Sequence, residues 1–162
     1  MKSHVDITRS AEISDCKKYR YALWRHWGAG KSYAMFIGLN PSIADEKIDD
    51  PTIRRCMAFA KDWGYDGLCM ANLFAYRATL PEKMKRSKDP IGPDTNKWLN
   101  KLAKKADIVV AAWGVHGQFM QRGQEVQQMI QPLQYLRLTK RGYPGHPLYL
   151  PKTLVPQPWI EE

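Results

Sequence analysis

The sequence predicts a single three-layer α/β/α domain over residues 1–162, with a central, mainly parallel four-stranded sheet and an N-terminal edge strand or hairpin. Three observations favour this fold. Short, continuously apolar segments alternate with helical patterns, which is typical of parallel strands covered on both faces. The length suits one domain. No linker and no internal repeat divides the chain.

The strand and helix patterns follow one another regularly. Residues 19–27 predict an edge strand, and Gly28 to Lys31 a hairpin turn into a buried strand at residues 33–39. Helices are expected at residues 51–63, 95–105 and 118–130, and further strands at residues 67–74, 107–113 and 133–138. A long loop at residues 75–93 connects the predicted strand at residues 67–74 to the predicted helix at residues 95–105.

Composition narrows the class of partner. Lys and Arg outnumber Asp and Glu by 25 to 16, which gives a net charge of +9 and favours a polyanion such as DNA. No apolar run reaches membrane-spanning length and MKSHVDITRS has no apolar signal core, so we expect a cytoplasmic monomer without a membrane partner. Cys16, Cys56 and Cys69 are odd in number and widely spaced. They predict buried free thiols rather than disulfides or a zinc site, and we expect no metal and no cofactor.

Polar residues and glycines gather in four loops that follow predicted strands. In parallel α/β folds, ligands bind beyond the carboxyl ends of the strands. This rule selects residues 40–50, 72–79, 114–118 and 142–150 as the borders of a site.

The same loops carry a family resemblance. GLNPS at residues 38–42, MANLFAYRA at 70–78, AAWGVHGQ at 111–118 and GHPLYL at 145–150 stand in the order of the motifs of uracil-DNA glycosylases. The first motif is closest to the mismatch-specific uracil/thymine branch. Each motif is weak alone, but four in order are much stronger. The chain also looks like a bacterial and phage domain family of unassigned function. The resemblance implies a uracil-DNA glycosylase-like fold.

The resemblance implies two catalytic residues. Cleavage of an N-glycosidic bond passes through an oxocarbenium-like sugar while negative charge develops on the base. His146 matches the histidine that donates to the base, and Asn40 matches the residue that positions the water. The main branch has an aspartate where Asn40 stands. Asp45, Asp49 and Asp50 follow in the same loop and could supply the missing carboxylate.

A second set is implied to bind the base. Asn72 matches the amide that reads the Watson–Crick edge of an extruded pyrimidine. Ser42 stands where the main branch has a tyrosine that blocks the 5-position, so we expect a pocket that admits 5-substituted pyrimidines. The base-binding set is Gly38, Leu39, Pro41, Ser42, Asn72 and Phe74, with Tyr76 as an alternative stacking residue.

A third set is implied to contact DNA. Tyr149 and Leu150 match an apolar wedge that enters the duplex, and Gly114 with His116 resembles a phosphate-contacting turn. The full DNA-binding set is Arg77, Gly114, His116, Gln118, Pro147, Tyr149 and Leu150. Arg54, Arg55 and the basic residues between Lys83 and Lys88 are further candidates for phosphate contacts.

The sequence therefore predicts a DNA glycosylase that hydrolyses the bond to a damaged, mismatched or 5-modified pyrimidine flipped out of DNA. Two alternatives remain open. One is a protein that binds a base, a nucleotide or DNA without cleavage. The other is a different modified-base-processing enzyme on the same fold.

Overall fold

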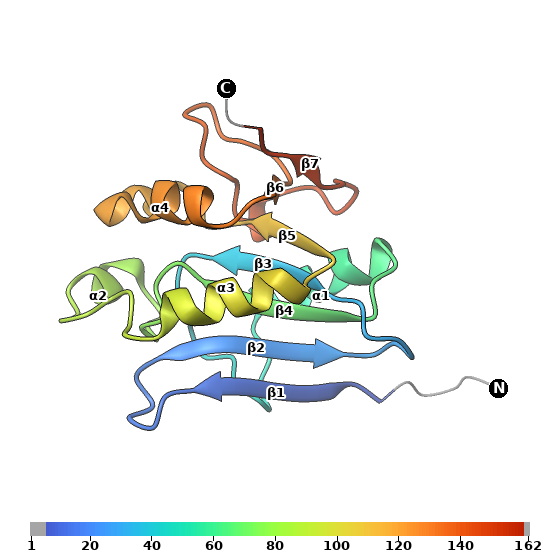
Figure 1. Ribbon diagram of the computed structural model, residues 1–162, viewed down its shortest axis with the longest axis horizontal. Coiled ribbons are helices and arrows are strands. Elements are labelled where there is room, and N and C mark those ends of the chain that lie inside the picture. The colour runs from blue at the N-terminus through green and yellow to red at the C-terminus, as the bar shows by residue number, and fades with distance from the viewer. Residues whose placement is uncertain (1–5, 161–162) are drawn as a thin grey trace.

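The computed structural model describes residues 6–160, which form an α/β protein with a seven-stranded mixed sheet (Figure 1). The sheet order is β1-β2-β4-β3-β5-β6-β7. The strands are β1 Thr8–Ile13, β2 Arg20–His26, β3 Ala34–Gly38, β4 Gly67–Asn72, β5 Ile108–Ala111, β6 Gln134–Tyr135 and β7 Gln157–Pro158. The helices are α1 Pro51–Asp62, α2 Pro81–Lys85, α3 Thr95–Lys105 and α4 Arg122–Met129, with 3₁₀ turns η1 Val115–Gln121 and η2 Pro147–Tyr149.

Helices cover both faces of the sheet. On one face α1 packs through Ile53, Cys56 and Phe59 against alternate residues of β3, β4 and β5. On the other face α3 and α4 pack through Leu99 and Val126 against the remaining residues of the same strands (Figure 1). The central strands are thus buried on both sides, which explains their continuously apolar sequences.

The parallel core is the part of the sheet that positions the site. β3 pairs in parallel with β4 on one side and with β5 on the other, and β5 pairs in parallel with β6. Gly38 and Asn72 are register partners at the last positions of β3 and β4. The chain leaves these two neighbouring strands toward opposite faces, since α1 and α3 cover different sides. Such a switch point opens a crevice at the strand ends.

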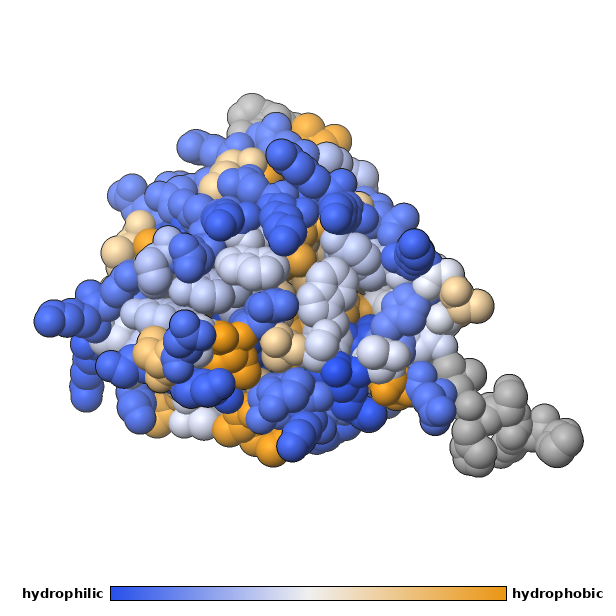
Figure 2. Space-filling model, turned by 60° about the horizontal axis from the view of Figure 1, so that its bottom comes forward, coloured by the Kyte–Doolittle hydropathy of each residue, from blue (hydrophilic) through white to orange (hydrophobic). Residues whose placement is uncertain are grey.

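The strand predicted at residues 19–27 forms as β2, but it lies inside the sheet, so the prediction of an edge position is wrong. β2 pairs antiparallel with β1 and with β4, and it is mostly buried. The predicted hairpin from β2 into β3 does not form, because β4 lies between them. The hairpin partner of β2 is β1, whose sequence TRSAEI is too polar to predict a strand and which lies at the edge. Figure 2 shows that side, where hydrophilic side chains dominate and apolar groups form separate areas.

Other boundaries also differ from prediction. The expected loop at residues 75–93 contains α2, and the expected helix at residues 118–130 begins only at Arg122. A backbone kink at Phe119 and Met120, with Met120 at φ 56°, lies inside η1, and Gln121 at φ 55° directly precedes α4. The predicted strand at residues 133–138 shortens to β6, which pairs with the unpredicted β7.

The cysteines are free, as predicted. Cys56 and Cys69 are buried as predicted, and burial raises the pKa of both thiols. Cys16 is exposed, so the prediction of a buried thiol is wrong for this residue. Among residues 6–160, no helix combines the length and the apolarity that crossing a bilayer requires.

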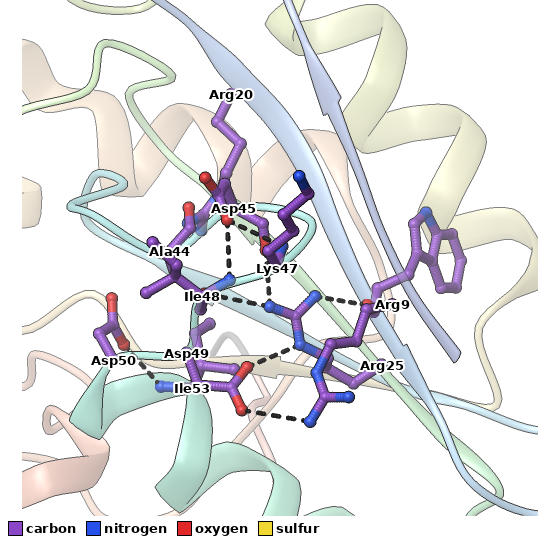
Figure 3. A network of polar contacts seen from close by, with 11 residues as sticks. Arg9, Arg20, Arg25, Ala44, Asp45, Lys47, Ile48, Asp49, Asp50 and Ile53 are labelled. Atoms are coloured by element: carbon purple, nitrogen blue, oxygen red, sulfur yellow. Dashed lines mark hydrogen bonds and ion pairs between the residues drawn. The ribbon is translucent and has the colours of Figure 1, made fainter. Parts of the chain in front are cut away.

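A buried arginine of β2 holds the loop that follows β3 (Figure 3). Arg25 has an exposed fraction of 0%. Its Nε donates to Asp49 Oδ1 at 2.7 Å, and its Nη atoms donate to the carbonyls of Trp24, Asp45 and Ile48 at 2.8, 2.6 and 3.1 Å. One guanidinium therefore satisfies two carbonyls and one carboxylate of a segment without regular structure, as well as the carbonyl of Trp24 in its own strand.

We expect Arg25→Met to lower the free energy of unfolding by about 3–5 kcal/mol, because it leaves Asp49 and three carbonyls without their donor. Urea denaturation followed by circular dichroism measures the change. Arg54→Met, an exposed position on α1, is the control and should change stability by less than about 0.5 kcal/mol. Equal stability of the two variants would contradict the role of Arg25.

Candidate functional site

A cleft of about 780 Å³ opens at the carboxyl ends of β3, β4 and β5. All four predicted loops border it, through residues that include Asn40, Asn72, Gly114 and His146. The volume is in the range of small-molecule sites. Ten of the predicted site residues line the cleft: Gly38, Leu39, Asn40, Ser42, Asn72, Gly114, His116, His146, Tyr149 and Leu150.

Asn40 follows β3 and is held by its own amide group. Its Nδ2 donates to the carbonyl of Ala78 at 2.9 Å and to that of Pro41 at 3.1 Å. With both amide hydrogens used, Oδ1 is the atom left to accept a hydrogen bond from a water or a ligand. An aspartate here would lose both donors and place negative charge against two carbonyls. The local backbone therefore fits an amide rather than an acid.

His146 has the tautomer that a neutral donor requires. Its Nδ1 accepts a hydrogen bond from the backbone N–H of Leu148 at 3.2 Å, so in the neutral ring the proton is on Nε2. Burial lowers the pKa of His146, while the negative charge of Asp50 acts in the opposite direction. The imidazole is therefore neutral near pH 7 and offers one N–H donor.

Asn72, at the end of β4, is buried and receives a hydrogen bond from a residue that sequence patterns did not select. Arg20 Nη2 donates to Asn72 Oδ1 at 3.3 Å, and Arg20 Nη1 donates to the carbonyl of Ala44 at 3.0 Å. Arg20 lines the cleft with an exposed fraction of only 2%. Burial lowers its pKa to about 10, so it still carries its charge at neutral pH.

The three loop aspartates have different positions. Asp45 accepts from the N–H groups of Lys47 and Ile48, which lower its pKa, and Asp49 pairs with Arg25. Asp50 alone of the three lines the cleft. Its Oδ1 caps α1 by accepting from Ile53 N at 2.9 Å, as Figure 3 shows.

Five predicted site residues lie outside the cleft lining. Phe74 is fully buried and packs on Phe119 with ring centroids 5.6 Å apart, so stacking on a base is a prediction that the structure contradicts. Gln118 lies in a neighbouring hollow, where its Oε1 accepts from Tyr143 at 3.0 Å. The others are buried Pro41 and Pro147, and Arg77, which donates to the Lys17 carbonyl. Tyr76, the alternative stacking residue, packs edge-on against Tyr19.

The two predicted wedge residues separate in the structure. Leu150 packs against the core on the α1 face, and Arg55 of α1 donates to its carbonyl at 2.9 Å. Tyr149 has an exposed fraction of 84% and its ring lies 5.5 Å from that of His146. Of the two, Tyr149 is therefore the one that is exposed. Of the two arginines predicted to contact phosphates, Arg55 donates to a carbonyl of the protein's own backbone, whereas Arg54 is exposed.

The turn at Gly114 needs glycine. Its φ of 72° and ψ of −168° belong to a region that other residues avoid, and its N–H donates to the carbonyl of Pro144 at 2.8 Å. Next to it His116 contacts the basic segment of residues 83–88, because Lys85 Nζ lies 3.1 Å from its Nδ1. Lys83, Arg86 and Lys88 of this segment are exposed.

Comparison with known proteins identifies a family. A family model described as a protein of unknown function (DUF1643) matches residues 20–148. The chain belongs to the DUF1643 family. The matched segment begins at Arg20 and includes Asn40, Asn72 and His146. This agrees with the expectation of a domain family without an assigned function. Neither a curated protein nor a solved structure matches the chain.

The lowered pKa of His146 predicts a pH dependence of stability. The unfolded chain takes up this proton near pH 6.5, the folded protein only at lower pH. Between these values the unfolded state binds more protons, so stability falls as the pH is lowered from about 6.5. His146→Gln should flatten this part of the profile, measured as urea midpoints between about pH 5 and pH 8. Parallel profiles of the two proteins would contradict the assignment.

Proposed function

We propose that this protein is a DNA glycosylase that hydrolyses the N-glycosidic bond of a 5-modified, mismatched or damaged pyrimidine flipped out of DNA. The observation that carries the proposal is the tautomer of His146. The backbone N–H of Leu148 occupies Nδ1 of the neutral imidazole, so the ring donates a hydrogen bond from Nε2. The resemblance of four ordered motifs to uracil-DNA glycosylases supports the same reaction, as does their convergence on one cleft.

The proposed reaction needs a donor that stabilises charge on the departing base. As the bond to the sugar breaks, negative charge gathers on a base oxygen, and a preorganised N–H there lowers the barrier. A neutral imidazole is suited to this task because it keeps its proton while strengthening the hydrogen bond. The positive charge of Arg20 in the same cleft also favours an anionic leaving group.

The water must be positioned on the sugar side. In the proposal Asn40 Oδ1 accepts from this water and orients it, since an amide oxygen cannot usefully take a proton. Asp50 is the carboxylate that lines the same cleft and is the candidate to polarise the water. This division of labour suits a base that is itself a good leaving group.

The DNA side of the proposal depends on charge and on one exposed aromatic ring. The net charge of +9 favours phosphate contacts, as do the exposed Lys83, Arg86 and Lys88 in the segment whose Lys85 contacts His116. Exposed Ile43, Val115 and Tyr149 line the cleft, and exposed Leu80 lies beside Pro81, another lining residue. Such side chains can offset the stacking lost when a base leaves the duplex.

A binding protein that does not cleave is the second candidate. The feature that favours it is Asn40, whose amide is tied to two carbonyls and which cannot act as a base. Base-dependent binding to DNA without formation of abasic sites would favour this candidate.

The first test is a screen for abasic sites in duplexes that hold uracil, thymine or 5-hydroxymethyluracil in a mismatch, and in phage DNA with modified pyrimidines. We expect excision of at least one 5-substituted base, because Ser42 leaves that side open. His146→Ala should lower single-turnover excision by about 10²–10³-fold. His26→Ala, at the far end of β2, is the control. Excision of plain uracil alone would refute the open pocket, and an unchanged rate for His146→Ala would remove His146 from the reaction.

The second test separates the two functions of Asp50. Asp50→Asn keeps an oxygen that can cap α1 but removes the charge, so thermal stability should change little. Excision should fall by about 10²–10⁴-fold if the carboxylate polarises the water. Asp62→Asn, at the end of α1, is the matched control and should excise normally. A normal rate for Asp50→Asn would show that Asn40 orients the water without help from an acid.

A further inference from the structure

Arg20 is a buried cation whose role the fold alone does not explain. Among residues 6–160 no carboxylate lies within ion-pairing distance of it, unlike Arg25 and Arg122. Its Nε is buried and has no hydrogen-bond partner among the residues that the structure describes. A charge buried in this way is a local cost to stability, because a guanidinium normally keeps its donors paired.

The contact of Arg20 with Asn72 settles which way the Asn72 amide faces. A guanidinium has donors only, so the atom that meets Arg20 Nη2 at 3.3 Å must be the oxygen of the amide. The nitrogen Nδ2 then lies on the other side, 3.1 Å from the place where a side chain on Gly38 would begin. Gly38 lines the cleft and, as a glycine, leaves this space to the N–H groups of Asn72.

We propose that Arg20 is a positioning residue that locks Asn72 with its N–H donors toward the cleft, so that the site takes pyrimidines with an oxygen at position 4 and rejects those with an amino group there. This inference rests on the proposed function. A free asparagine can rotate its amide and serve either an acceptor or a donor. With Arg20 behind it, rotation sets the NH₂ group against a guanidinium and leaves both without an acceptor.

The buried charge also strengthens the donor. A cation on Oδ1 polarises the amide, which makes the N–H groups of Asn72 better donors to an oxygen that gains negative charge. An amino group in that place would face two donors and would lose its own hydrogen bonds with water. Sites of this kind discriminate strongly against the mismatched analogue.

The test compares 5-hydroxymethyluracil with 5-hydroxymethylcytosine, which differ at position 4. Each is placed in the same mismatched duplex on a 2′-fluoroarabino sugar, which slows cleavage, and binding is measured by fluorescence anisotropy. We expect the wild-type protein to bind the uracil duplex at least about tenfold more tightly. Arg20→Met should bring this ratio close to one. Arg20→Lys, which retains a charged donor, should restore part of the preference.

Asp49→Asn is the matched control, because it weakens the anchoring of the same loop without touching the contact between Arg20 and Asn72. It should keep the wild-type ratio. Circular dichroism checks that each variant is folded. If Arg20→Met does not fold, the wild-type ratio and the Arg20→Lys ratio still decide the question.

Two results would overturn this inference and leave the proposed function standing. One is a folded Arg20→Met variant that keeps the wild-type preference for the uracil duplex. The other is wild-type protein that binds both duplexes equally while Asn72→Ala binds neither. A different result would refute the proposed function and the inference with it. That result is wild-type affinity for DNA that does not depend on which base the duplex holds, together with no abasic sites on any substrate of the screen.

Discussion

The position of the site depends on two guanidinium groups that β2 places beneath the loop after β3. Arg25 binds the carbonyls of Asp45 and Ile48 and the carboxylate of Asp49, and Arg20 binds the carbonyl of Ala44 (Figure 3). This loop has no regular structure of its own, so its backbone needs donors from elsewhere. The loop in turn carries Asn40 at its start and Asp50 at its end, and both face the cleft.

The antiparallel hairpin at the edge is therefore part of the site rather than an appendage. β2 pairs with β4 and runs opposite to it, so its first residue, Arg20, lies beside the last residues of the parallel strands. The backbone N–H of Arg20 donates to the carbonyl of Ala75, which follows β4. The switch point between β3 and β4 opens the crevice, and the start of β2 supplies the charge at its floor.

Local sequence patterns predicted those parts of the structure that local physics decides. Continuous apolar runs predicted β3, β4 and β5, and the four polar loops that follow predicted strands predicted the cleft that Asn40, Asn72 and His146 line. Local patterns did not predict which strands pair when they lie far apart in the sequence. β1 is polar because one side of an edge strand faces water, and residues 19–27 predicted an edge strand although Arg20 and Arg25 of β2 are buried. Phe74 failed for a related reason, since two more residues beyond β4 return the chain to the core.

The balance of charge in the cleft bears on what chemistry it can support. Three of its polar groups are donors: the buried guanidinium of Arg20, the amide N–H groups of Asn72 and the neutral imidazole of His146. Against these stand one carboxylate, Asp50, and the amide oxygen of Asn40. Oδ1 of Asp50 accepts the hydrogen bond that caps α1, which leaves the other carboxylate oxygen for a water or a ligand. In the proposed reaction such a site contributes more by stabilising an anionic leaving group than by activating the nucleophile. A base whose 5-substituent already makes it a better leaving group fits that balance, and in the proposal Ser42, which lines the cleft, leaves space for that substituent.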